Sequence, residues 1–238
     1  MIKKSVGNMY PWVTHTHCHL GGECPHKCVY CYVDHFPFGR PAKYQGPLRI
    51  TEKELSVKYG SGKTIFIENC NDLFAEAVPY EFISKIISHC CEHPMNTYVF
   101  QTKNPKRFEC FIRDLPGERI LGTTIETNRH YLGWSSAPDP IERARAMNMI
   151  QARKFITIEP IMNFDVDILT SWIDLIRPEF VNIGADSKGH NLPEPSADKV
   201  SSLIKNLKGC GIEIREKHNL HRLLGGHVHD DLPWRANA

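Results

Sequence analysis

The chain has 238 residues, of which 41% are apolar and 24% charged, and its net charge is +2. These values are ordinary for a globular domain of barrel size, and they neither require nor exclude a nucleic-acid partner. The first residues form no apolar signal segment, and no stretch approaches the ~18 apolar residues of a membrane span. Nine cysteines at irregular spacing indicate reduced thiols, so we expect a cytoplasmic protein without a membrane partner.

Short apolar runs alternate with amphipathic segments along most of the chain. We predict strands at 10–16, 65–67, 97–101, 119–125, 154–158 and 180–183, with a trailing strand at 211–214. We predict helices at 80–90, 105–115, 141–150, 166–176 and 196–207, after a short helix at 51–59 that begins with a capping box of Thr51 and Glu54. Strands that alternate with helices favour a parallel sheet that is buried on both faces. Six such units predict an α/β fold, a partial (β/α)6 barrel of the TIM type.

The chain shows no internal repeat, no low-complexity tract and no sign of a second core. We therefore expect a single domain over 1–238, with its core at about 10–210. The C-terminal tail at 215–238 is polar and rich in histidine, and we expect it to form a lid or a loose end.

A cysteine-rich loop follows the first predicted strand. Cys24, Cys28 and Cys31 have the spacing C-x3-C-x2-C, and Tyr30 directly precedes the last cysteine. A short loop with this spacing can wrap three thiolates around one cubic iron–sulfur cluster. Four cysteines would complete the ligand set of a [4Fe–4S] cluster, whereas three leave one iron open for a substrate or cofactor.

Zinc is the alternative metal for this region. A tetrahedral zinc site at the loop would need a fourth ligand, for which His26, His19 or Cys18 are candidates. A separate zinc-dependent hydrolase site would use His15 and His17, because two histidines on one face of a strand can share a metal. The hydrolase alternative leaves the three-cysteine loop unexplained.

Polar residues follow every predicted strand from the second to the sixth. Ligands of parallel α/β folds bind beyond the carboxyl ends of the strands. We therefore expect the ligand site among the segments at 68–72, 101–105, 123–129, 158–163 and 182–188.

The cysteine loop, with its flanking tyrosine, resembles the cluster loop of the radical S-adenosylmethionine (SAM) superfamily. Segments at 12–16, 71–74, 101–105, 158–161 and 181–185 are similar to a group of phage and bacterial radical SAM proteins without an assigned reaction. This similarity extends over roughly residues 10–190. The layout also resembles, more distantly, the spore photoproduct lyase-like group, with Thr102-Lys103 after the third strand.

The resemblance implies an enzyme whose reaction is unassigned, a lyase or an oxidoreductase that modifies its substrate. In this superfamily, three cysteines hold a [4Fe–4S] cluster whose open iron binds SAM. The reduced cluster cleaves SAM to methionine and a 5′-deoxyadenosyl radical. The implied partners are SAM and a reducing protein of the flavodoxin or ferredoxin type.

The charged ends of SAM suggest roles for four residues at the strand ends. Glu68 or Asn69 suits the SAM ammonium, although related enzymes carry a Gly-Gly-Glu-like segment at this place. Lys103 or Arg129 suits the SAM carboxylate.

The ribose and adenine groups of SAM need other partners. Thr124, Glu126 and Asn128 suit the ribose hydroxyls. Tyr30 beside the cluster can pack on the adenine ring, and the segment around Glu159 can line the adenine pocket.

Cys70 is a candidate catalytic residue, because it lies at a strand end outside the cluster loop. A thiol is a good hydrogen-atom donor to a carbon radical, and some radical SAM DNA-repair lyases use a thiol in this way. The alternative is a small buried core residue, as free cysteine often is.

Two substrate classes remain open. The first is a nucleic acid or nucleotide that the enzyme repairs or modifies, for which the basic residues of the middle third are the support: Lys103, Lys106, Arg107, Arg113, Arg143, Arg145 and Arg153. Helices often carry such charges as a solvated face. The second class is a protein or a small metabolite, which a short chain without an added domain would suit.

Overall fold

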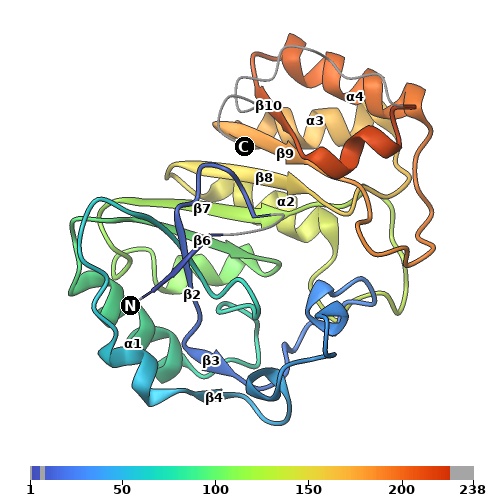
Figure 1. The fold of residues 1–238 in the computed structure, drawn as a ribbon. Helices are drawn as coiled ribbons and strands as arrows, with labels where there is room; N and C mark the ends of the chain where they lie inside the picture. The colour runs from blue at the N-terminus through green and yellow to red at the C-terminus, as the bar shows by residue number, and fades with distance from the viewer. Residues whose placement is uncertain (1, 6–8, 226–238) are drawn as a thin grey trace.

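A computed structural model describes residues 2–5 and 9–225 of the chain. Its centre is an eight-stranded sheet in the order β1-β2-β5-β6-β7-β8-β9-β10 (Figure 1). The first strand pair is antiparallel and all the following pairs are parallel. The strands are β1 (Lys3–Lys4), β2 (His15–His17), β5 (Thr64–Ile67), β6 (Thr97–Thr102), β7 (Arg119–Thr124), β8 (Lys154–Ile158), β9 (Phe180–Ile183) and β10 (Glu213–Glu216). A separate two-stranded sheet joins β3 (Leu20–Gly21) to β4 (Arg49–Ile50).

In the described part of the chain, four α-helices connect the strands: α1 (Tyr80–Cys91), α2 (Pro140–Met149), α3 (Val166–Ile176) and α4 (Ala197–Gly209). Helices α3 and α4 lie side by side next to the β9–β10 end of the sheet (Figure 1). The parallel strands and their helices confirm the predicted α/β fold class. Among the described residues, we find no helix with the length and apolar character of a membrane span.

The apolar side chains of β5 to β9 alternate between two clusters, as the period of a strand requires. The larger cluster contains Ile65, Phe100 and Ile156 together with the buried faces of the helices. The smaller cluster lies on the other face of the sheet and contains Phe66, Val99, Ile120, Phe155 and Phe180, with Tyr10 and Val13 of the N-terminal segment.

Two predicted helices differ from the structure. The segment at 51–59 forms a 3-10 helix only at Glu52–Ser56, and Thr51 makes no side-chain cap. The segment at 105–115 forms a 3-10 helix at Pro105–Cys110 and then turns, because Phe108 and Phe111 both pack around Phe74, with ring centroids 4.7 and 5.9 Å away.

The first strand is shorter than predicted and begins at His15 instead of residue 10. Tyr10 lies outside the strand and packs in the smaller apolar cluster. Its hydroxyl is hydrogen-bonded to Gln101 (2.8 Å) and Thr157 (2.7 Å). The short strands β1, β3 and β4 were not predicted, since two-residue strands carry no periodic signal.

The described start of the C-terminal tail is not a loose end. Residues His218–Arg222 form a 3-10 helix, and Leu220 and Leu224 are buried in the larger apolar cluster. Residues 226–238, the rest of the predicted lid, lie outside the described residues. The single domain over 1–238 stays a prediction.

Gly122 of β7 tests how tightly the smaller apolar cluster is packed. A Cβ at this position would lie 2.3 Å from the Phe155 ring. We expect Gly122→Ala to lower the free energy of unfolding by about 1–3 kcal/mol, the usual cost of overpacking a core. Urea denaturation measures the change. Gly117→Ala is the matched control, since nothing lies within 4 Å of its Cβ position, and equal stability of the two variants would contradict the packing.

Candidate functional site

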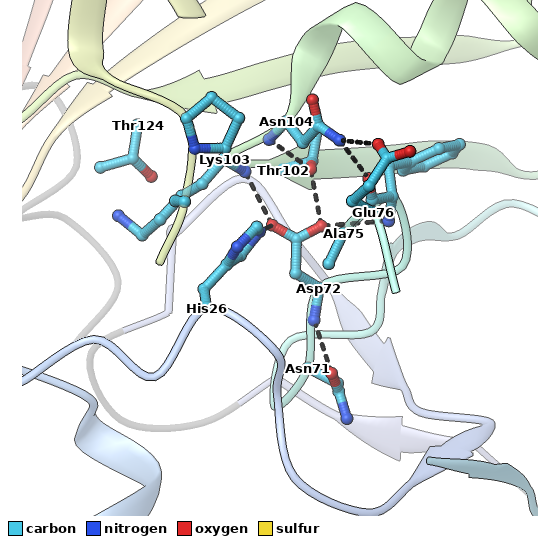
Figure 2. Close-up of polar contacts among 12 residues, drawn as sticks. His26, Asn71, Asp72, Ala75, Glu76, Thr102, Lys103, Asn104 and Thr124 are labelled. Carbon is cyan, nitrogen blue, oxygen red and sulfur yellow. Dashed lines mark hydrogen bonds and ion pairs between the residues drawn. The ribbon is translucent and has the colours of Figure 1, made fainter. Parts of the chain in front are cut away.

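The site lies where the parallel strands end, and it is organised around the cysteine loop (residues 22–31). Asp72, which follows β5, reaches this loop from the sheet (Figure 2). Its Oδ2 lies 2.8 Å from His26 Nε2 and accepts from the backbone N–H of Lys103 at 2.7 Å. Its Oδ1 accepts from the Thr102 hydroxyl at 2.6 Å and from the Phe74 N–H at 3.0 Å.

These partners allow a carboxylate to remain charged inside the protein. Burial would raise the pKa of Asp72, but the neighbouring His26 and the hydrogen bonds from Thr102 and Lys103 lower it below its ordinary value. A buried charge is tolerated only where it is paired and hydrogen-bonded. Asp72 therefore fixes the cysteine loop to the ends of β5 and β6.

A second clamp on the cysteine loop comes from the segment at 134–136. The Val29 N–H donates to the Trp134 carbonyl at 2.9 Å, and the Ser136 N–H donates to the His26 carbonyl at 2.6 Å. On the inner side, the Asn71 side chain donates to the Gly22 carbonyl at 3.1 Å. The backbone of the loop is thus held from both sides.

The three cysteines of the loop are free thiols with intermediate exposure. Burial raises the pKa of Cys24 to about 12, and it also raises the pKa of Cys31. The Cys28 sulfur lies 3.1 Å from the Ser135 hydroxyl. Three partly exposed thiols on one clamped loop suit an iron–sulfur cluster, in which each thiolate binds a different iron. Their protons would leave on binding.

The predicted zinc donors are used elsewhere. His26 is paired with Asp72, and His19 lies between Glu68 (2.9 Å) and His89 (2.9 Å). Of the hydrolase pair, His17 bonds to the Glu54 carbonyl at 3.2 Å. Within residues 2–5 and 9–225, no group of three or more His, Cys, Asp or Glu is arranged for a single metal ion.

The predicted SAM-site residues Tyr30, Lys103 and Glu126 lie together. The Glu126 side chain is fully buried. It accepts from the Tyr30 hydroxyl at 2.8 Å, pairs with Arg143 at 2.8 Å and contacts the Lys103 ammonium. The Lys103 ammonium also lies 5.2 Å from the centre of the Tyr30 ring.

The charge of Glu126 depends on its two cationic partners. Burial would raise the pKa of Glu126, but Arg143 and Lys103 reverse this effect and lower it to about 2. Arg143 also donates to the Thr124 carbonyl at 2.6 Å. Sequence reasoning placed Arg143 in a surface basic group; its helix position after Asp139-Pro140 gave no sign that it turns inward.

Glu68 has an anchoring role in the structure. It has a positive φ of 62° and is only 2% exposed. Its Oε1 accepts from the backbone N–H of His19 at 2.5 Å, and its Oε2 accepts from that of Leu20 at 3.2 Å. Both oxygens thus hold the segment that leads into the cysteine loop.

The other predicted SAM contacts lie at different strand ends. The Thr124 hydroxyl accepts from Gln101 at 2.9 Å inside the curved sheet. Asn128 is bonded to Asp165, which donates its N–H to the Asn128 side chain at 2.7 Å.

Glu159 directly follows β8. It pairs with Lys217 at 2.6 Å and accepts from Asn219 at 3.1 Å. It also lies close to Gly184, where an added Cβ would meet the Glu159 carboxylate at 2.8 Å.

Cys70 packs against a small cluster of Cys18, Val33 and Tyr44, and the Cys18 thiol donates to Asn69 Oδ1 at 3.0 Å. The Tyr32 hydroxyl lies 3.6 Å from the Cys70 sulfur. Hydrogen bonds from Cys18, Tyr32 and Tyr44 lower the pKa of Cys70 to about 6, against the opposing effect of burial. The pKa of Cys18 is raised well above its ordinary value by the same Cys18–Cys70 bond and by burial.

Comparison with solved structures identifies the fold. Spore photoproduct lyase complexed with dinucleoside spore photoproduct has a TM-score of 0.55 and 11% identity, over 93% of this chain and 77% of that chain. Streptococcus suis SuiB bound to S-adenosylmethionine has a TM-score of 0.58 and 10% identity, over 89% of this chain and 52% of that chain. The chain thus spans about half the length of SuiB. Both are partial barrels of the radical SAM type, which confirms the predicted barrel.

The chain belongs to the family described as proteins of unknown function, DUF5131, whose model matches residues 26–193. A comparison with curated proteins gave no significant match.

Asp72→Asn tests the first clamp on the cysteine loop. We expect faster hydrogen exchange at the amides of residues 22–31 and a loss of about 1–3 kcal/mol in the free energy of unfolding, because His26 loses its charged partner inside the protein. Hydrogen-exchange mass spectrometry reads the loop directly. Asp114→Asn is the control at an exposed position, and equal loop exchange in the two variants would contradict the clamp.

Glu126→Gln tests the buried ion pairs. A pKa lowered from 4.5 to about 2 corresponds to about 3 kcal/mol of stability at pH 7. This contribution is complete above about pH 4.5 and is lost as the pH falls toward 2. We therefore expect denaturant titrations to show a gap between wild type and variant that is smaller at pH 4 than at pH 7.

The exposed Glu109→Gln serves as the control for this measurement. A gap for Glu126→Gln that is unchanged between the two pH values would contradict the assigned charge state.

Proposed function

We propose that this chain is a radical SAM enzyme in which Cys24, Cys28 and Cys31 hold a [4Fe–4S] cluster. The observation that carries the proposal is the position of the cysteine loop. It presents three free thiols at the carboxyl edge of the parallel sheet, and Asp72 together with the segment at 134–136 fixes its backbone. A spore photoproduct lyase variant with bound AdoMet has a similar fold, with a TM-score of 0.52 and 12% identity over 86% of this chain and 64% of that chain. Its bound AdoMet supports SAM as the cofactor.

When bound and reduced, such a cluster supplies the electron that cleaves SAM to methionine and a 5′-deoxyadenosyl radical. The protein contributes binding, orientation and shielding. Tyr30 follows Cys28 by two residues and bonds to the buried Glu126, so its ring is held in one orientation beside the cluster loop. The Lys103 ammonium over this ring is the cation we assign to the SAM carboxylate.

The SAM ammonium needs acceptors near the end of β5. Both oxygens of Glu68 are occupied by the backbone at His19 and Leu20, so in this proposal Glu68 shapes the site from behind. Asn69 stays the proposed acceptor for the ammonium, which would take the place of the Cys18 thiol that donates to Asn69 Oδ1 at 3.0 Å. We still assign Thr124 and Asn128 to the ribose hydroxyls of SAM. The segment around Glu159 stays assigned to the adenine pocket.

The basic residues of the middle third give less support to a nucleic-acid substrate than the sequence suggested. Arg143 and Lys103 pair with Glu126, Arg107 donates to the carbonyls of Ala75 and Val78, and Arg153 pairs with Glu179. These four cations are paired within the fold, whereas Lys106, Arg113 and Arg145 are exposed.

A nucleotide or nucleic-acid substrate therefore rests on the dinucleoside-bound spore photoproduct lyase structures. SuiB bound to precursor peptide SuiA has a TM-score of 0.60 and 10% identity over 89% of this chain and 50% of that chain. Because of this similarity, a protein or peptide is the second candidate substrate. Salt-dependent binding of an oligonucleotide, absent for a peptide, separates the two. A flavodoxin or ferredoxin stays the proposed electron donor.

Anaerobic reconstitution with iron and sulfide tests the metal assignment. We expect about four iron and four sulfide per chain in the wild type, and loss of the bound cluster in Cys24→Ala, Cys28→Ala and Cys31→Ala, because each thiolate binds one iron. Iron and sulfide analysis measures the content. Cys110→Ala, at an exposed cysteine outside the loop, is the matched control. A wild type that binds one zinc and no sulfide would refute the proposal.

A further inference from the structure

A buried series of hydrogen bonds runs from Glu68 to helix α1, behind the segment that enters the cysteine loop. Glu68 Oε1 lies 2.9 Å from His19 Nδ1, and His19 Nε2 lies 2.9 Å from His89 Nδ1. His89 Nε2 in turn lies 3.0 Å from the carbonyl oxygen of Val57. Glu68, His19 and His89, which we call the histidine network, are 2%, 0% and 3% exposed, so they depend on one another for hydrogen bonds.

The two ends of the histidine network fix where its protons lie. The Val57 carbonyl can only accept, so His89 donates to it from Nε2. The two Glu68 oxygens accept backbone N–H groups, from His19 at 2.5 Å and from Leu20 at 3.2 Å, and such bonds favour the ionised form of a carboxyl group. A carboxylate can only accept, so His19 donates to Glu68 from Nδ1.

The middle of the network then lacks one proton. A neutral imidazole carries a single N–H, and each ring has already used it at the outer end of the network. If both rings were neutral, His19 Nε2 and His89 Nδ1 would face each other across 2.9 Å with two lone pairs and no hydrogen between them. A hydrogen bond at this distance requires one further proton, and the resulting positive charge balances the buried carboxylate of Glu68.

The aromatic neighbours of the pair leave this charge on His19. Burial and the neighbouring His19 lower the pKa of His17 to about 3, and they also lower the pKa of His89. Burial raises the pKa of Tyr59, whose hydroxyl lies 3.0 Å from His19 Nε2. His17 and His89 are therefore neutral, and Tyr59 keeps its proton.

We propose that one additional proton is held between His19 and His89, and that His89 is a positioning residue for the entry to the cysteine loop. His89 accepts from the His19 imidazolium, and the imidazolium compensates the charge of Glu68. Glu68 in turn holds the backbone N–H groups of His19 and Leu20, two residues before the loop begins at Gly22. Helix α1 thus fixes the start of the loop through two side chains.

The proton count follows from contacts that are independent of the proposed function. It bears on that function in one respect, the choice of acceptor for the SAM ammonium. The carboxylate of Glu68 is compensated by His19 and bonded to two backbone N–H groups, so it does not compete with Asn69 for an ammonium group.

The test is nitrogen-15 NMR spectroscopy of the full chain, labelled at histidine, at pH 7 and without added iron. We expect both ring nitrogens of His19 to carry a proton and His89 to carry one at Nε2 only. We also expect a proton resonance between His19 Nε2 and His89 Nδ1 that exchanges slowly with water, because the bond is buried.

His89→Phe removes the accepting nitrogen and keeps a ring of similar size. We expect His19 to lose its Nε2 proton and to accept from Tyr59 instead. The amides of His19 and Leu20 should then exchange about tenfold faster, the factor that corresponds to one lost hydrogen bond to a charged group. Hydrogen-exchange mass spectrometry measures this change, and circular dichroism confirms that the variant is folded.

Two further variants separate the accepting nitrogen from the ring. His89→Asn offers an amide oxygen in place of Nδ1, and we expect it to restore the His19 imidazolium and the slow exchange. His93→Phe is the matched control, because the His93 ring lies 5.5 Å from the His89 ring and its Nε2 has no hydrogen-bond partner among the described residues. We expect this control to leave the His19 signals unchanged.

Two outcomes would overturn the proposal. A single N–H on His19 in the wild type, with His89 also neutral, would remove the additional proton, and this result needs no variant that folds. An unchanged His19 imidazolium and unchanged amide exchange in His89→Phe would remove the role of His89. Both measurements are made without iron or SAM, so failure of the histidine network and failure of the cluster assignment give different results.

Discussion

The contact between Asp72 and His26 is the constraint on which the arrangement of the site depends. A carboxylate that is buried between a sheet and a loop is stable only if its charge is compensated from both sides. Thr102 and the Lys103 backbone supply the sheet side, and His26 supplies the loop side. Because His26 lies between Cys24 and Cys28, this hydrogen bond sets where the thiols stand relative to the strand ends.

Glu126 is a second buried carboxylate of the site, and its charge is also compensated by its partners. It joins Tyr30 of the cysteine loop to Lys103 after β6 and Arg143 of α2. Two cations and one carboxylate leave this network with a net positive charge next to the loop. That charge favours anionic groups, which agrees with a role in holding the carboxylate of a cofactor.

The fold followed from the sequence because strands and helices of this chain carry clear periodic signals. The bounds of β8, α3 and β9 match the predicted 154–158, 166–176 and 180–183. The site was predicted only in part, since a polar residue at a strand end can face the ligand space or the backbone. Glu68 turns to the backbone through a positive φ, and Arg143 turns inward to a partner 17 residues away. Neither orientation produces a local pattern in the sequence.

The most direct test of the account is the product of SAM after anaerobic reconstitution of the full chain and reduction with dithionite. The account predicts 5′-deoxyadenosine and methionine in equal amounts from the wild type. It predicts neither product from a variant in which Cys24, Cys28 and Cys31 are all replaced by alanine. Intact SAM in the presence of a fully assembled and reduced cluster would contradict the assignment of this fold and loop to radical SAM chemistry.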